Sequence, residues 1–259
     1  MAGAANRGRR PRAAGRGQRM EPSVRMQIEE WQGSIAASIE QHVTPYLVKL
    51  RGIDYVLFPE TFNPNYAKAS LLLLDNLGVR PGDTVLDPFT GSGADAIFAV
   101  LQGAARAVAI DKFTMPVLCA RYNAYRLGID DRVDVRQGDL FDALRPGERF
   151  DLIVANPPFR PADPHSSVEA MMRDPAHATL RRFFAEIGDH LNPGGRMRIV
   201  FSNAGNVGQF HQLVEAHGFT ATAIARARYA SDVVMEVYEV TPVPAAVSRA
   251  GADLLQARG

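Results

Sequence analysis

Four short runs of this chain that are typical of strands each end at a polar side chain, and this repeated pattern most constrains the fold. The runs alternate with stretches of helical spacing, which is typical of a parallel sheet with helices on its faces. The four polar residues are Asp87, Asp111, Asp139 and Asn156. Because parallel strands end along one edge of a sheet, we expect these side chains to border one ligand crevice.

Residues 151–159 carry the most distinctive sequence, Asp-Leu-Ile-Val-Ala-Asn-Pro-Pro-Phe. A buried strand stops there at an amide, and the two prolines that follow fix φ near −65° and cannot donate hydrogen bonds. Asn156 supplies an oxygen acceptor, the next carbonyl supplies a second one, and Phe159 supplies a flat face. The segment therefore suits a planar NH2 group. A simple connecting loop is the alternative interpretation.

Asn156-Pro157-Pro158-Phe159 after a strand resembles the substrate motif of S-adenosylmethionine-dependent amino-methyltransferases. The resemblance implies that these four residues hold the accepting nitrogen. In such enzymes that nitrogen belongs to a glutamine amide, to adenine N6 or to guanine N2. The implied role of the protein would be alignment, since the cofactor carries the reactive methyl group.

A glycine loop lies earlier in the chain, where residues 84–93 are expected to form a strand and a loop before a helix over 94–101. Gly91 and Gly93 let the backbone pass close to a ligand, and the helix would present free N–H groups. Asp111 follows Asp87 by 24 residues, which is close to the spacing of an acid that binds ribose hydroxyls. A lone Gly-x-Gly is weak evidence, but here it follows a strand and opens a helix.

The order of these motifs over residues 53–241 looks most like the methyltransferase small-domain family, which includes the release-factor glutamine N5-methyltransferases. The resemblance implies S-adenosyl-L-methionine as cofactor, with its amino-acid end at the glycine loop, its ribose at Asp111 and its adenine at Asp139. The implied cofactor-binding residues are Asp87, Pro88, Phe89, Thr90, Gly91, Gly93, Asp111, Lys112, Asp139, Leu140 and Asn156. No metal is implied.

The chain departs from the glutamine methyltransferases at two points. Phe89 stands where those proteins usually have a third glycine, and the N-terminal region is shorter than their helical domain. The loop looks more like that of DNA and RNA amino-methyltransferases, although Asp95 replaces a threonine common there. The acceptor therefore stays open among a protein or peptide amide, an exocyclic amine of RNA or DNA, and a small molecule. A scaffold without methylation is a further alternative.

The expected fold is a Rossmann-like seven-stranded methyltransferase sheet that ends in an antiparallel hairpin, preceded by a small helical cap. We expect an Arg-rich disordered tail over 1–22, a cap and strand-helix lead-in over 23–80, the catalytic domain over 81–242 and a C-terminal tail over 243–259. The cap helix should bury one face, made of Ile28, Trp31, Ile35, Ile39 and Val43.

Several local features complete the expected structure. Asn63 should cap a helix that starts at Pro64 and ends near Gly78, and Glu60, Thr61 and Phe62 are candidate ligand contacts. A helix over 176–191 should end in a turn at 192–195 before a strand over 196–201. Residues 160–175 are expected to form a loop over the active site. The histidines at 42, 177, 190, 211 and 217 are expected at the surface.

Charge and cysteine content narrow the choice of partner and compartment. Residues 1–20 carry six arginines and no acid, so the remainder has 23 basic and 28 acidic residues. A mildly acidic body disfavours nucleic acid and favours a protein, peptide or small-molecule acceptor. No apolar run approaches the ~20 residues of a membrane span. Cys119 is the single cysteine, which fits a reducing cytoplasm. The oligomeric state is not indicated.

Overall fold

The computed structural model describes residues 22–229 and 233–244 of the 259-residue chain, with side chains described from residue 26 onward. Residues 1–21 and 245–259, which make up nearly all of the two expected tails, lie outside the described residues. The expected turn near Ala230-Ser231-Asp232 lies outside them as well.

The described chain forms one seven-stranded sheet in the order β5-β4-β3-β6-β7-β9-β8. The first five strands of this order, β5, β4, β3, β6 and β7, each pair in parallel with their neighbours among these five. Strand β9 pairs antiparallel with both β7 and β8. The strands are β3 (Thr84–Asp87), β4 (Arg106–Asp111), β5 (Val133–Gln137), β6 (Phe150–Ala155), β7 (Leu191–Ser202), β8 (Phe219–Arg228) and β9 (Val234–Pro242). The predicted sheet and its terminal antiparallel hairpin are thus confirmed. The strand order reverses between β3 and β6, where a crevice forms in open α/β sheets.

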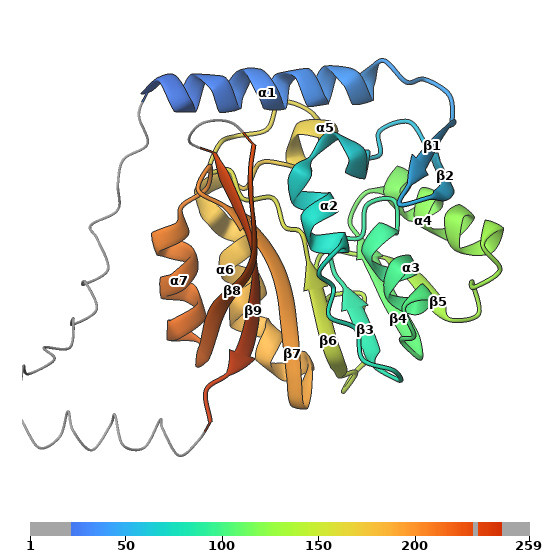
Figure 1. Ribbon diagram of the computed structural model, residues 1–259, viewed down its shortest axis with the longest axis vertical. Helices are drawn as coiled ribbons and strands as arrows, with labels where there is room; N and C mark the ends of the chain where they lie inside the picture. The colour runs from blue at the N-terminus through green and yellow to red at the C-terminus, as the bar shows by residue number, and fades with distance from the viewer. Residues whose placement is uncertain (1–21, 230–232, 245–259) are drawn as a thin grey trace, which may run out of the picture.

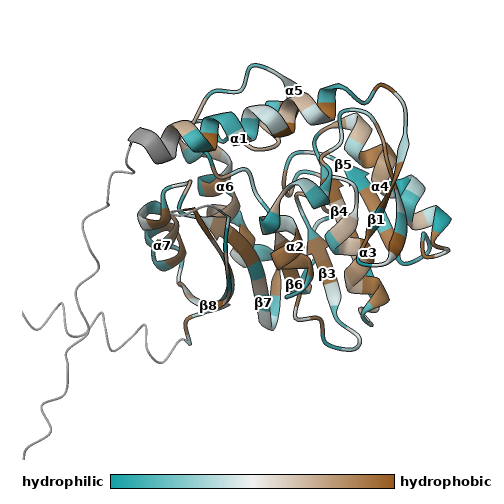
Figure 2. Ribbon diagram, turned by 45° about the horizontal axis from the view of Figure 1, so that its top comes forward, coloured by the Kyte–Doolittle hydropathy of each residue, from teal (hydrophilic) through white to brown (hydrophobic). Residues whose placement is uncertain are grey.

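Helices flank both faces of this sheet (Figure 1), and the apolar residues gather on the strands and on the inner helix faces (Figure 2). The helices are α2 (Lys68–Leu74), α3 (Ala94–Leu101), α4 (Thr114–Arg126), α6 (Ala178–Glu186) and α7 (Val207–Ala216). The central strand β6 shows why the fold is stable, because Leu152 to Ala155 are completely buried. A strand covered on both faces needs such a continuous apolar run.

Helix α1 (Pro22–Glu40) lies across the carboxyl ends of the parallel strands, above the short helix α5 (Ser167–Ala170) (Figure 1). Ile35 and Ile39 of α1 pack with Val168 and Met172 in a small apolar cluster of their own. Ile28, Ile35 and Ile39 are buried as predicted, and Trp31 is half-buried. Val43 is not part of this face, because it follows the end of the helix and is 81% exposed.

The lead-in between α1 and β3 differs from the expectation in two ways. An antiparallel hairpin, β1 (Tyr46–Leu50) and β2 (Ile53–Leu57), occupies a region where only one strand was expected. The expected helix from Pro64 is divided into a 3-10 turn (Pro64–Tyr66) and α2, because Ala67 between them is extended, and α2 ends before Gly78. Asn63 does cap the 3-10 turn, since its side chain accepts from the Asn65 N–H at 3.0 Å.

The expected helix over 176–191 is also interrupted. Pro175–His177 and Ile187–His190 are 3-10 turns on either side of α6, and both Ala176 and His177 have positive φ. His177 is buried, against the expectation of a surface position. Residues 192–195 fall inside β7 as an irregularity, because the pairing with β6 shifts between Leu191 and Arg196. This position was predicted to be a turn.

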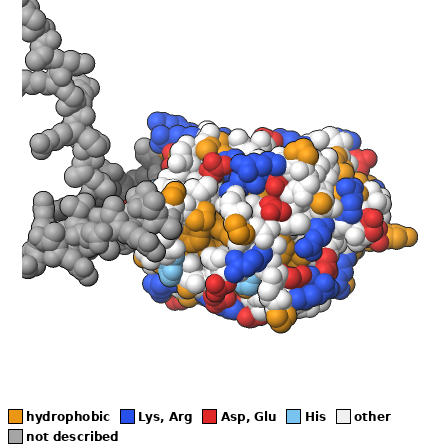
Figure 3. Space-filling model, turned by 90° about the horizontal axis from the view of Figure 1, so that it is seen from below, with side chains coloured by type: hydrophobic (Ala, Val, Ile, Leu, Met, Phe, Trp, Pro, Cys, Tyr) orange, Lys and Arg blue, Asp and Glu red, His pale blue; other side chains and the backbone are white. Residues whose placement is uncertain are grey.

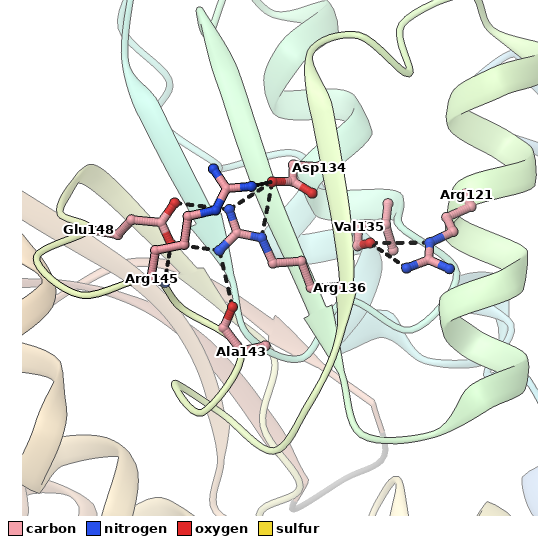
Figure 4. Close-up of polar contacts among 7 residues, drawn as sticks. All are labelled: Arg121, Asp134, Val135, Arg136, Ala143, Arg145 and Glu148. Carbon is pink, nitrogen blue, oxygen red and sulfur yellow. Dashed lines mark hydrogen bonds and ion pairs between the residues drawn. The ribbon is translucent and has the colours of Figure 1, made fainter.

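Ion pairs and hydrogen bonds hold β5, the strand at one edge of the sheet (Figure 4). The Arg136 guanidinium lies 2.6 Å from Glu148 and 2.7 Å from Asp134, and Arg121 of α4 donates to the Val135 carbonyl at 2.9 Å. Hydrogen bonds from Arg136 lower the pKa of Glu148 to about 2. These contacts bind β5 to helix α4 and to the loop that precedes β6, so the loop after β5 starts from a fixed position.

Candidate active site

A pocket opens at the carboxyl ends of the central strands, beneath α1. Its wall contains residues from the loops that follow four successive strands, β3, β4, β5 and β6. The predicted site residues on this wall are Pro88, Phe89, Thr90, Gly91, Asp111, Lys112, Asp139, Leu140, Asn156, Pro157, Pro158 and Phe159. The fold therefore brings together in one cavity residues that are up to 71 positions apart in the sequence.

Asp87 and Gly93 are absent from this wall and lie behind it. The buried Asp87 carboxylate accepts from the Thr90 hydroxyl at 2.7 Å and from the Phe89 N–H at 3.3 Å. Gly93 precedes α3 with a φ of 87°, and a Cβ there would lie 2.9 Å from the Cβ of Ala120. Both residues shape the glycine loop from behind the pocket wall.

Asp111 joins the glycine loop to the loop after β4. One of its carboxylate oxygens accepts from the Gly91 N–H and the other from the Phe113 N–H, both at 2.9 Å. Burial raises the pKa of Asp111, and these N–H bonds oppose the shift. A carboxylate oxygen has more than one lone pair, so each can accept a further hydrogen bond. Asp111 can thus bind two neighbouring hydroxyl groups on the pocket side.

Asp139 does not end a strand, since β5 finishes at Gln137 and Asp139 follows two residues later. Its side chain is 55% exposed and lies 3.5 Å from the Arg182 guanidinium of α6. Arg182 also pairs with Asp142 and Glu186, so it holds this loop against the helix. Leu140 is buried and lines the pocket with a positive φ, which turns the chain there.

Asn156 has one side of its amide already engaged. Its Nδ2 donates to the Ser70 hydroxyl of α2 at 3.0 Å. Ser70 itself is buried and lines the pocket. Because the amino group is engaged in this way, the Asn156 Oδ1 is left as an acceptor, and the next residue on the pocket wall, Pro157, has a carbonyl that can also accept.

Phe159 is held by the residues behind it. Its ring lies edge-on to Phe201 of β7 at 5.8 Å between centroids. Gly205 approaches the Phe159 carbonyl so closely that a Cβ at Gly205 would lie 2.7 Å from that oxygen. The ring is 8% exposed and lines the pocket. Phe159 can therefore offer a rigid apolar surface to a bound planar group.

Two buried carboxyl groups, Asp87 and Asp95, stand close together at the start of α3. Burial raises the pKa of both, and the charge of Asp87 raises the pKa of Asp95 further. Asp95 lines the pocket, whereas Asp87 does not. This corner of the cavity consequently favours a bound positive charge.

Several lining residues were not predicted as site residues from the sequence. Trp31, Gln32 and Ile35 of α1, and Ser70 of α2, all contribute to the wall. The amphipathic pattern of α1 predicted a buried face, but no local signal says which surface that face covers. Of the three candidate contacts at 60–62, Phe62 lines the pocket.

The segment over 160–175 was expected to form a loop over the active site, and its residues 170–172 line the pocket. It contains a helix, α5, whose N-terminus is capped by the Ser166 hydroxyl. The loop is closed on itself, because Arg160 and Arg173 form an isolated parallel bridge. Met171 and Met172 are thereby placed on the same cavity as Phe159.

The sequence of the chain matches the methyltransferase small domain over residues 65–230. The chain belongs to this family of S-adenosylmethionine-dependent methyltransferases. The release factor glutamine methyltransferase of Rhodopirellula baltica is 29% identical over 184 residues, which cover 66% of this chain and 62% of that protein. The putative protein N5-glutamine methyltransferase MJ0928 of Methanocaldococcus jannaschii is 25% identical over 197 residues, which cover 74% and 97%.

Solved structures share the fold. A 16S rRNA N2 methyltransferase of T. thermophilus (RsmC), solved in complex with AdoMet and guanosine, superposes with a TM-score of 0.55 at 21% identity. The match covers 77% of this chain and 50% of that chain. Within the described ranges, no helix is long and apolar enough to cross a membrane. The same residues contain no group of three or more His, Cys, Asp and Glu side chains that could hold a metal ion.

Proposed function

We propose that this protein transfers a methyl group to a planar nitrogen, and that the acceptor is a glutamine-type amide of a protein or peptide. The observation that carries the proposal is the orientation of Asn156, whose Nδ2 donates to Ser70, while its Oδ1 accepts no hydrogen bond from the part of the chain that the structure describes. Two relatives named as glutamine methyltransferases support the choice of an amide. We place the reaction in the cytoplasm, which suits the free, buried thiol of Cys119.

The pocket wall fits S-adenosyl-L-methionine. Asp111 would accept from the two ribose hydroxyls, and Asp139 would accept from the adenine amino group beside the apolar Leu140. The acidic corner at Asp95 would face the positive end of the cofactor. When bound, S-adenosylmethionine supplies the activated methyl group.

The residues of this chain would act on the acceptor by alignment. Asn156 Oδ1 and the Pro157 carbonyl would each accept one hydrogen of the NH2 group, which orients the nitrogen and raises its electron density. Phe159 would stack on the plane of the acceptor. Good alignment of two reacting groups can lower a barrier by ~7–11 kcal/mol.

The charges on the pocket favour an uncharged acceptor. Among the described residues that line the cavity, Lys112 carries the single cationic side chain, and it belongs to the loop after β4. A nucleic-acid acceptor brings phosphates that need several Lys or Arg contacts. On the face opposite α1, basic and acidic side chains are interspersed (Figure 3), so that face offers no single-sign surface for a phosphate backbone.

The class of acceptor is tested by mass spectrometry of a cell extract incubated with the protein and deuteromethyl-labelled cofactor. We expect the protein fraction to gain label on glutamine side chains. Label in RNA, in DNA or only in small molecules contradicts the amide proposal and identifies the acceptor class that replaces it. Absence of label from every fraction, with the cofactor bound in calorimetry, contradicts methyl transfer itself.

The role of Asn156 is tested by Asn156→Ala. We expect turnover to fall about 100-fold because the acceptor nitrogen is no longer aligned. The cofactor affinity measured by calorimetry should stay within about twofold, which separates alignment from cofactor binding. Ser70→Ala serves as the matched control. It removes only the group that orients Asn156, and it should cost roughly tenfold. Full turnover in Asn156→Ala contradicts the assigned role.

A further inference from the structure

Gln32 is a buried polar residue in a helix that otherwise covers the pocket with apolar side chains. It is 2% exposed and lies between Trp31 and Ile35 on the pocket wall. Its Oε1 accepts from the Arg160 Nη1 at 2.7 Å. Burying an amide is costly unless its polar atoms find partners, so a glutamine at this position needs an explanation.

The bond to Arg160 determines which way the Gln32 amide faces. A guanidinium group has donors and no acceptor, so Gln32 must turn its oxygen toward Arg160. The Gln32 Nε2 is left on the other side, and within the described residues it makes no hydrogen bond. It is also not among the fully enclosed, unpaired polar atoms of those residues. The Nε2 donor therefore keeps some accessible surface, and Gln32 belongs to the wall of the cavity.

Arg160 is itself fixed in place, so it can hold Gln32 firmly. It follows Phe159 directly, is 5% exposed and forms an ion pair with Glu29 of α1. Its backbone carbonyl accepts from the Asp174 N–H at 2.6 Å. Arg160 thus couples the Asn-Pro-Pro-Phe segment to α1 and presents Gln32 to the same cavity as Asn156.

The pocket consequently contains two side-chain amides that face it with opposite polarity. Asn156 offers an oxygen acceptor because Ser70 holds its Nδ2, and Gln32 offers an N–H donor because Arg160 holds its Oε1. A primary carboxamide has the complementary pair of groups, an NH2 donor and a carbonyl acceptor on one carbon. A carboxylate would face Asn156 Oδ1 with a second oxygen, and an alkyl amine would leave Gln32 without an acceptor.

We propose that Gln32 is an acceptor-binding residue that selects an uncharged carboxamide by donating to its carbonyl oxygen, and that Arg160 is its positioning residue. This inference rests on the proposed methyl transfer and assigns the part of the pocket that recognises the acceptor. With this role of Gln32, helix α1 determines which acceptor binds, in addition to covering the pocket. Discrimination by a hydrogen bond is effective because the wrong acceptor leaves a buried polar group unpaired.

The test compares kcat/KM of the full chain for four probes that differ in the group offered for methylation. The probes are N-acetyl-glutamine methylamide, the matching glutamate and lysine derivatives, and adenosine, all with deuteromethyl-labelled cofactor. We expect the wild-type protein to label the glutamine probe best. Gln32→Leu should lower kcat/KM for that probe roughly fivefold to tenfold, chiefly through KM, because a neutral hydrogen bond is lost.

Gln32→Glu is the sharper variant, because a carboxylate keeps the contact with Arg160 but turns a second acceptor toward the cavity. It should lose more activity on the glutamine probe than Gln32→Leu while its melting temperature is maintained. Gln27→Leu changes an exposed glutamine of the same helix and should behave as wild type. Cofactor affinity in calorimetry should be unchanged in all three variants.

Two results overturn the inference and leave methyl transfer standing. One is wild-type kcat/KM on the glutamine probe in both Gln32 variants, and the other is preferential labelling of adenosine or of the lysine probe by the wild-type protein. A wild-type protein that binds cofactor but labels neither a probe nor a cell extract contradicts the proposed function instead. The two failures are therefore distinguishable.

Discussion

The buried carboxyl group of Asp95, close to the glycine loop, makes the stability of the folded protein depend on pH. Asp95 is buried at the first turn of α3, and its pKa is raised by burial and by the neighbouring Asp87. An acid with a raised pKa in the folded protein stays protonated there after the unfolded chain has ionised. Stability is therefore lost as the pH rises above ~4, and the loss continues until the pH passes the folded pKa.

Asp95→Asn removes this titration with almost no change in shape. We expect the variant to melt higher than the wild-type protein, with a larger difference at pH 8 than at pH 5. A difference of a few degrees is expected, since about 1 kcal/mol shifts the melting temperature of a domain this size by about 2–4 °C. Calorimetric melting at both pH values measures it. An equal difference at the two pH values contradicts the argument.

Elements governed by local chemistry were predicted well. Helix α3 occupies residues 94–101 as expected, because the strand, the glycine loop and the apolar period all indicate it. Strand β1 was missed because its five residues have no partner until Ile53–Leu57 folds back on them. The irregular start of β7 was read as a turn, since Pro193 and Gly194 suit a turn and only pairing with β6 extends the strand.

In the candidate site too, some residues could be predicted from the sequence, whereas others depend on tertiary contacts. Strand-end residues such as Asp111 and Asn156 could be predicted, because parallel topology alone brings them to one edge. Gln32 could not, since its position depends on α1 crossing the sheet and on the buried Arg160. Asp139 reached the pocket from a loop rather than from the strand end that the sequence indicated.

Helix α1 contains an avoidable weakness at Gly33. This glycine is exposed in the helix interior, and a Cβ there would meet nothing within 4 Å. Gly33→Ala should therefore stabilise the helix by about 0.5–1 kcal/mol. Hydrogen exchange of α1 amides should slow by roughly twofold to fivefold, if opening of the helix limits exchange.

The control for this change is Gly52→Ala in the β1–β2 turn, where φ is 87°. That substitution should destabilise the hairpin, because alanine is strained at positive φ. Unchanged exchange in α1 of the Gly33 variant, together with an unchanged urea midpoint, contradicts the prediction, because a more stable helix slows exchange whether α1 opens alone or with the whole fold.

At the scale of the whole molecule, charge is distributed unevenly along the chain. The full chain has a net charge of +1, whereas residues 20–259 alone carry 23 basic and 28 acidic side chains. A variant that begins at Met20 therefore separates the arginine-rich start from the acidic body. Its kcat/KM for the glutamine probe should stay within about twofold of the full chain between 50 and 200 mM salt, because an uncharged acceptor releases no counterions.

An acceptor that carries phosphate groups would give a different result in this experiment. A phosphate-bearing acceptor that needed those arginines would lose affinity steeply on truncation, and the loss would depend on salt. Such a result contradicts the amide acceptor independently of the Gln32 variants. Melting of the truncated chain serves as the control for folding.

The match to the methyltransferase small domain begins at residue 65, whereas α1 ends at Glu40. The cavity is thus assembled from residues inside the family match and from α1, which precedes that match. Substitutions on α1 can change which acceptor the cavity takes, and those at Glu29 or Gln32 also act on Arg160 beside the Asn-Pro-Pro-Phe segment. Exchanging α1 for a different helix while residues 65–230 are kept should therefore change the range of acceptors that the enzyme admits.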